Sequence, residues 1–252
     1  MALSTYEHLQ AFSKKVAEGL PPPLFYRTFG EDLRRAEDLL RNHGTVSACR
    51  THLGEALLEC AHGLCHCESV ARDAGAIVLI EGHQRGMPDE VVGPLAESAV
   101  IAGLLHDIKR REEDHAVRGS IEAERILKAV GMDGRFREYI VYAIRNHEAF
   151  KQTCDLGDEA GCMVSDALYD ADKFRWGPEN FTTTLWIMVD DRGTSPERLH
   201  GIFQDKMKGI ERIKDTFRTG TGRTYGPEII DQGITIGNAI YEEMTLLLRK
   251  SS

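Results

Sequence analysis

The most constraining feature of this sequence is an unbroken run of small and apolar residues that ends in a histidine and an aspartate. The seven residues Ala99–Leu105 contain no polar side chain, and His106 and Asp107 follow them directly. Burying a carboxylate costs several kcal/mol unless it is paired, hydrogen-bonded or bound to a metal. The chain must therefore supply partners for this pair, and the candidates elsewhere in the sequence are His66, His115, His147 and Asp172.

The composition is that of an ordinary globular protein and argues against two classes of partner. The chain has 252 residues, of which 42% are hydrophobic and 28% charged, so one domain with a sizeable core is expected. A net charge of −9 without a basic stripe argues against nucleic acid and against anionic membrane surfaces. Neither a signal peptide nor a membrane-spanning apolar segment is recognisable, and the expected location is the cytoplasm.

Hydrophobic periodicity predicts helices almost throughout, which indicates an all-α fold. The stretch 181–189 is rich in β-branched residues, but a buried helix suits its neighbourhood better. Two glycine-containing segments, 82–86 and 218–226, are expected to be loops, and the second lacks the order of a Walker phosphate-binding loop. The other predicted helices cover residues 4–18, 31–43, 47–73, 88–106, 115–130, 135–147, 161–174, 195–217 and 228–249.

Periodicity also says which polar side chains face inward. His147 falls in the apolar stripe formed by Phe136, Ile140 and Ala143, so it is expected to point into the core. A single inward histidine is often just a hydrogen-bonded core residue, and ligation is the alternative. Farther along the chain, Asp170 and Asp172 flank the stripe of their helix on opposite edges, and the period alone leaves open which one faces a site.

His66, His106, Asp107 and Asp172 together form a set of donors with metal-ligand chemistry. Two imidazoles and two carboxylates suit a divalent ion such as Mn²⁺, Zn²⁺, Mg²⁺, Fe²⁺ or Ni²⁺. A His-Asp dipeptide by itself is common by chance. The ordered set of a histidine, a His-Asp pair and a later aspartate, all on predicted helices, is much more specific.

With this set the sequence resembles the HD-domain superfamily of metal-dependent phosphohydrolases. The matching pieces are His66–Val70, the signature Ala102–Asp107 and Tyr169–Lys173. The resemblance implies an HD-domain helical bundle with a core at about residues 47–190, an N-terminal helical arm at 1–46 and C-terminal helices at 191–252, all in one domain. It also implies a metal held by His66, His106, Asp107 and Asp172, and so favours Asp172 over Asp170 as the ligand.

The resemblance implies hydrolysis of a small phosphate ester or anhydride, such as a nucleotide. The expected catalytic and phosphate-binding residues are Asp107, which would orient the water or take its proton, Lys109 and Arg110. Side chains expected to contact the substrate or the ligands are His62, His115, His147 and Lys173. Many relatives carry a glutamate at the position of Arg110, and Phe174-Arg175-Trp176 follows Lys173 where many relatives carry leucine and aspartate, so both departures add positive charge.

Two other functions remain open at this point. A few HD proteins hold two irons and activate O₂, and His115 and His147 supply the two extra histidines in the right order, although His115 follows His106 by only nine residues. The other alternative is a binding or signalling module that keeps the fold without the chemistry. The intact ligand set argues against that module, and the sequence says nothing about the oligomeric state.

Overall fold

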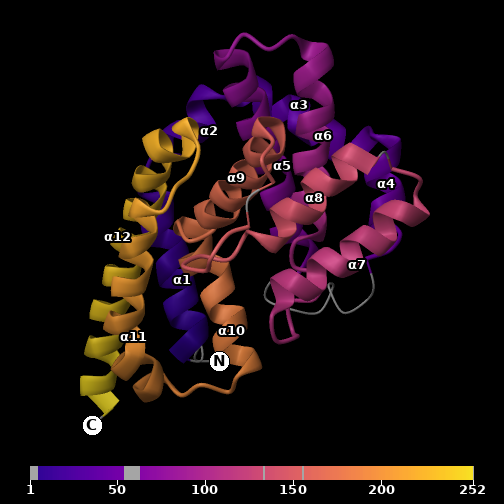
Figure 1. Cartoon of the computed structure of the whole chain (residues 1–252). Coiled ribbons are helices and arrows are strands. Elements are labelled where there is room, and N and C mark those ends of the chain that lie inside the picture. Colours follow the sequence, from indigo (N-terminus) through magenta and orange to yellow (C-terminus); the bar gives the residue numbers. More distant parts are fainter. Residues whose placement is uncertain (1–4, 54–62, 133, 155, 252) are drawn as a thin grey trace.

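A computed structural model of the chain describes residues 5–53, 63–132, 134–154 and 156–251, and no strand occurs among them (Figure 1). The predicted all-α class is therefore confirmed. Residues 181–189 are helical, as expected. The elements are α1 (Thr5–Glu18), α2 (Leu24–Thr28), α3 (Gly30–Asn42), α4 (Gly44–Arg50), α5 (Leu64–Gln84), α6 (Asp89–Leu105), α7 (His115–Ala129), α8 (Gly134–Arg145), α9 (Glu159–Phe174), the π-helical turn η2 (Asn180–Thr184), α10 (Leu185–Asp191), α11 (Pro196–Glu211), the 3₁₀ turn η3 (Arg212–Asp215) and α12 (Gly220–Ser251).

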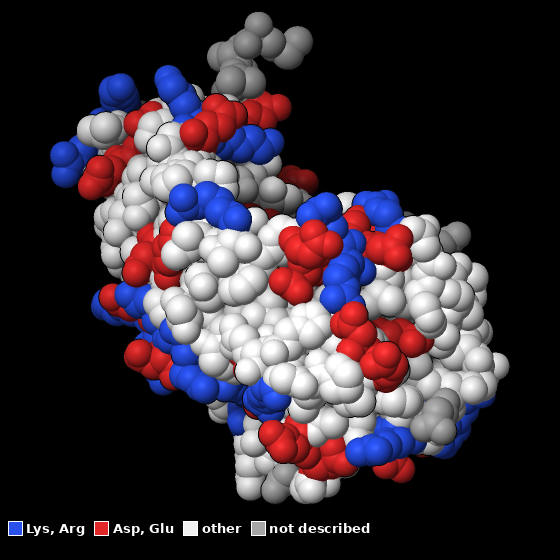
Figure 2. All heavy atoms as spheres, turned by 90° about the horizontal axis from the view of Figure 1, so that it is seen from above, with Lys and Arg blue, Asp and Glu red and all other residues white. Residues whose placement is uncertain are grey.

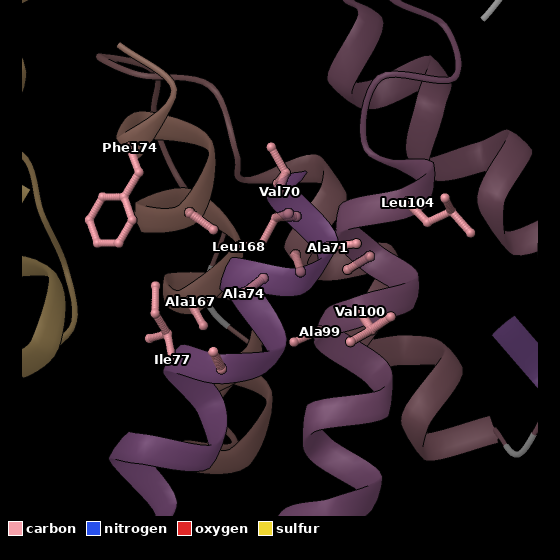
Figure 3. Packing of buried hydrophobic residues seen from close by; sticks show 14 of the residues in the cluster. Val70, Ala71, Ala74, Ile77, Ala99, Val100, Leu104, Ala167, Leu168 and Phe174 are labelled. Carbon is pink, nitrogen blue, oxygen red and sulfur yellow. The ribbon is translucent and has the colours of Figure 1, made fainter. Parts of the chain in front are cut away.

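The centre of the molecule is α5, which lies between α6 and α9 (Figure 3). Several of its buried residues are alanine or glycine, so the neighbouring helices approach closely. A Cβ on Gly103 of α6 would collide with the Cα of Ala71 and lie 2.6 Å from its backbone nitrogen. This contact fixes α6 against α5 less than one turn before His106.

Three predictions of where helices begin and end are wrong. The two segments that were expected to be loops are helical for the same reason, because their glycines allow close packing. In place of one helix over 47–73, α4 ends at Arg50 and α5 begins at Leu64, with the extended Gly63 as its N-cap. The expected loop at 82–86 is helical up to Gln84. The expected loop at 218–226 is helical from Gly220 onward, because its glycines serve close packing rather than turns: a Cβ at Gly226 would collide with the Phe217 ring.

The N-terminal helices pack into the same core. Phe25 of α2 is fully buried, and its ring lies 5.0 Å from that of Phe174 at the end of α9. The neighbouring Tyr26 donates its hydroxyl hydrogen to Asp73 Oδ2 of α5 at 2.7 Å. Helix α1 packs along α12 and η2, whereas α3 packs against α5 and α6 (Figure 1).

The surface mixes both signs of charge. On the face shown in Figure 2, Lys and Arg side chains alternate with Asp and Glu. Many of these charges form ion pairs with a residue of the same helix, as Arg34 does with Glu31 at 2.5 Å. Among the described residues, no helix combines the length and the apolar character that crossing a membrane requires.

Candidate metal centre

The His106 side chain is buried at the end of α6, and its orientation is set by its own helix. Its Nδ1 lies 2.8 Å from the carbonyl oxygen of Gly103. Because a carbonyl oxygen only accepts, Nδ1 carries the proton and the Nε2 lone pair faces His66 across the site. Burial lowers the pKa of the His106 imidazole to about 4, so the ring is neutral near pH 7.

Four donor atoms converge on one point between α5, α6 and α9. His66 Nε2 lies 3.3 Å from His106 Nε2, 3.5 Å from Asp172 Oδ1 and 3.9 Å from Asp107 Oδ2. His106 Nε2 lies 3.5 Å from Asp107 Oδ2 and 3.8 Å from Asp172 Oδ1. Ligands at ~2.1 Å from one ion, at angles of 90–110°, are ~3.0–3.5 Å apart. The five distances that include a histidine lie within a few tenths of an ångström of this range, and His66, His106 and Asp107 form a group that could hold a metal ion.

The other oxygen of Asp107 faces a second pair of histidines. Asp107 Oδ1 lies 3.7 Å from His115 Nε2 and 3.6 Å from His147 Nε2, and the two nitrogens are 3.3 Å apart. His147 Nδ1 donates to the carbonyl oxygen of Ile144 at 2.6 Å, which again turns Nε2 inward. Asp107 therefore belongs to two groups of possible metal ligands. One group also contains His66 and His106, and the other also contains His115 and His147.

Arg110 occupies the edge of this second group. Its Nη1 lies 2.9 Å from His115 Nε2, and its Nε lies 3.8 Å from Asp107 Oδ2. Burial alone would raise the pKa of the Asp107 carboxyl, but His106, His147 and Arg110 outweigh it and hold that pKa well below its usual value. Asp107 is therefore ionised, and its carboxylate is stabilised by His106, His147 and Arg110.

Asp172 is held by the residue that follows it. Lys173 is buried, and its ammonium group donates to Asp172 Oδ2 at 2.5 Å and to the carbonyl oxygen of His147 at 3.0 Å. Burial alone would raise the pKa of the Asp172 carboxyl, but Lys173 and His66 lower it well below the ordinary value. Lys173 therefore positions Asp172 and ties α9 to the turn that carries His147.

Asp170, the alternative that periodicity left open, points to another part of the molecule. Its carboxylate accepts hydrogen bonds from the backbone nitrogens of Arg218 and Thr219, both at 2.8 Å, and from the Thr219 hydroxyl at 2.7 Å. It thus holds the two residues that precede α12, of which Thr219 accepts the first-turn hydrogen bond from the backbone nitrogen of Gly222. The structure brings Asp172 and not Asp170 to the histidines.

Replacing Lys173 with methionine is expected to weaken metal binding by about 10–100-fold, the usual effect of removing a group that orients a metal ligand. Methionine keeps most of the side-chain volume but leaves Asp172 Oδ2 without its ammonium partner. Titration of the metal-free protein with Mn²⁺ in a calorimeter would measure the change. The exposed Lys208→Met is the control, and equal affinities for both variants would contradict a positioning role.

A cavity of about 220 Å³ opens beside these groups. Its lining has a charged half and a half that is mostly neutral. The charged half comprises His66, Asp107, Arg110, His147, Glu148, Asp172 and Lys173. The rest of the lining comprises Ala149, Arg175, Trp176, Asn180, Thr184 and Met188.

Of the predicted site residues, one does not line the cavity and one lies outside the described residues. The Lys109 ammonium pairs with Glu112 at 3.0 Å, and Lys109 does not line the cavity. His62 lies outside the described residues.

The neutral half of the lining was missed, because uncharged side chains on a short helical turn carry no recognisable motif. Arg175 could have been identified from the sequence, because it adds a positive charge just after Tyr169–Lys173, the last segment that resembles the HD-domain superfamily. Its guanidinium is tied to Tyr26, Asp73 and Glu179 and forms a buried wall.

Three curated proteins illustrate what the chain is similar to. Proteins from Ralstonia nicotianae, Nitrosospira multiformis and Burkholderia mallei, each named bifunctional uridylyltransferase/uridylyl-removing enzyme, are 30%, 26% and 29% identical to it. The alignments cover 59%, 66% and 38% of this chain but only 16%, 20% and 11% of those proteins. No family model matches the chain, and no solved structure matches it significantly. The homologues are thus much longer enzymes, and the chain corresponds to a fraction of their length.

Proposed function

We propose that this protein is a metal-dependent phosphohydrolase that cleaves a phosphate ester or anhydride in the cavity beside Asp107. The observation that carries the proposal is the convergence of His66 Nε2, His106 Nε2, Asp107 Oδ2 and Asp172 Oδ1, at distances of 3.3 to 3.9 Å for the pairs that include a histidine. We assign these four residues as the ligands of one divalent ion.

The residues around the ion would divide the work as follows. A divalent ion bound there supplies Lewis acidity, which lowers the pKa of water and withdraws charge from a phosphoryl oxygen. Asp107 orients the attacking water and accepts its proton through the carboxylate oxygen that faces His115 and His147. Arg110, half-exposed at the edge of the cavity, places positive charge where the phosphoryl oxygens gain negative charge.

The homologues support a nucleotidyl group as part of the substrate. Their name includes a uridylyl-removing activity, and removing a uridylyl group breaks a bond to phosphorus. The resemblance to the HD-domain superfamily, stated from His66, the His106-Asp107 pair and Asp172, leads to the same reaction class. We therefore place this chain among hydrolases of nucleotide-like phosphodiesters, monoesters or anhydrides.

Metal removal tests the proposal directly. Protein purified without chelators is expected to carry about one divalent ion per chain by elemental analysis. Dialysis against EDTA should abolish hydrolysis of p-nitrophenyl phosphate and of nucleotides, and Mn²⁺ should restore it. Circular dichroism before and after dialysis controls for unfolding. Full activity in the metal-free protein would contradict the proposal, and an inert protein without metal would favour a non-catalytic module.

The second histidine pair favours one other function enough to test. Asp107 lies between two groups of possible ligands, which is also the arrangement that a di-iron oxygenase of the HD type requires. The short spacing from His106 to His115 is no obstacle, because a tight turn places His115 at the first residue of α7, facing Asp107. Two irons per chain and substrate-dependent O₂ consumption would favour the oxygenase. Arg110 beside His115 argues for a single ion instead.

A further inference from the structure

The neutral half of the cavity contains two buried polar groups without a protein partner. Asn180 and Thr184 begin and end the π-helical turn η2, are 7% and 8% exposed, and both line the cavity. Neither the Asn180 amide nor the Thr184 hydroxyl forms a hydrogen bond with any residue that the structure describes. Their polar atoms are not among the fully buried atoms that lack a partner, so they open onto the cavity, where a ligand can contact them.

The lack of a side-chain hydrogen bond distinguishes Asn180 and Thr184, the two residues of the turn that line the cavity, from their neighbour Thr182. Between them, Thr182 donates its hydroxyl hydrogen to the carbonyl oxygen of Pro178 at 3.0 Å. The turn is also braced from behind, since Trp186 Nε1 donates to the carbonyl oxygen of Phe181 at 2.6 Å and lies 3.3 Å from the Ser13 hydroxyl of α1. Single π-helical turns are rare and frequently occur at functional sites.

Apart from the Arg175 guanidinium, which is tied to Tyr26, Asp73 and Glu179, the rest of this half suits a flat, uncharged group. Trp176 is 36% exposed and lines the cavity, as does Met188. An aromatic face, a thioether, an amide and a hydroxyl are the elements with which proteins hold a planar heterocycle. The charged residues that line the same cavity suit phosphate. A ligand that fills both halves has an anionic end and a planar end that forms hydrogen bonds.

We propose that Asn180 and Thr184 bind the base of a pyrimidine nucleotide whose phosphate lies at Asp107. The amide offers a donor and an acceptor side by side, which match the adjacent carbonyl and ring N–H of a uracil. This assignment rests on the proposed hydrolase function, because the phosphate must lie at the metal centre.

Two phosphodiesters with the same leaving group test the assignment. Uridine 5′-(p-nitrophenyl phosphate) carries the base, and methyl p-nitrophenyl phosphate does not. The Thr184→Val and Asn180→Ala variants are each expected to lose about 10-fold in kcat/KM for the uridine ester, mainly through KM. Both should stay within about twofold of the parent for the methyl ester. The control variant Thr182→Val, from the same turn, should leave both esters unaffected.

An equal loss for both esters would show a structural role for the turn and overturn the assignment, as would no loss for either. If the parent protein hydrolyses neither ester, the proposed function fails while the base site is still testable. Calorimetry with uridine 5′-monophosphate then decides: binding that Thr184→Val weakens about 10-fold supports the site. No binding by the parent, or equal binding by both, overturns it.

Discussion

Replacing Asp107 with asparagine is expected to abolish hydrolysis while the fold is retained. Asparagine keeps the shape of the side chain but removes the negative charge that faces His66 and His106 on one side and His115 and His147 on the other. Loss of a general base alone costs about 10²–10⁴-fold in rate. Because the variant also loses a charged ligand, we expect kcat for p-nitrophenyl phosphate and for nucleotides to fall by about 10³-fold or more.

Three measurements separate this effect from misfolding. Far-UV circular dichroism and the urea midpoint should match those of the parent, and elemental analysis should give less than one ion per chain. Asp205→Asn is the matched control, because Asp205 is exposed and pairs with Lys208 at the surface. That control should keep full activity and the full metal content. An Asp107→Asn variant that retains turnover would rule out this aspartate as the centre of the site.

Replacing Gly103 with alanine is expected to be the most damaging single-methyl change in the core. The added Cβ would collide with the backbone of Ala71, and two helix backbones cannot shift as a flexible side chain can. Overpacking of this kind costs about 1–3 kcal/mol, and we expect the upper part of that range in the free energy of unfolding, measured with urea. Metal affinity should also fall, because Gly103 O holds the His106 ring.

Gly201→Ala is the matched control for that substitution. Gly201 lies within α11, and a Cβ there would meet nothing within 4 Å. Alanine in an exposed helix is more stable than glycine by about 0.5–1 kcal/mol, so this variant should unfold at a higher urea concentration than the parent. If Gly103→Ala behaved like Gly201→Ala, the close approach of α5 and α6 would be wrong.

Much of the helical architecture around the site could be predicted locally. The run Ala99–Leu105 predicted a buried helix that ends at His106, and α6 ends at Leu105 with His106 as its C-cap. The stripe around Ile140 and Ala143 predicted an inward His147, and the structure buries that ring. Apolar periodicity is a property of neighbouring residues, so it could be read without knowing what the helices pack against.

Glycine was the residue type most often misinterpreted. Gly82 and the glycines after Thr219 suggested loops, yet they lie within helices where another element touches the backbone. A Cβ on Gly222 would collide with the Asp170 carboxylate, which binds Thr219 just before α12. In sequence, a glycine that permits a turn and a glycine that permits close packing look the same. Only the position of the neighbouring helix distinguishes them.

The sequence by itself determined that the fold is helical and that a His-Asp pair at the end of a buried helix needs partners, because these depend on local pattern and on the cost of burying charge. The tertiary structure decided which partners meet. It brings Asp172 rather than Asp170 to the histidines, turns Lys109 away, and places Asn180 and Thr184 in the cavity. Those outcomes depend on the rotation and crossing of helices distant in sequence, which no single helix's periodicity contains.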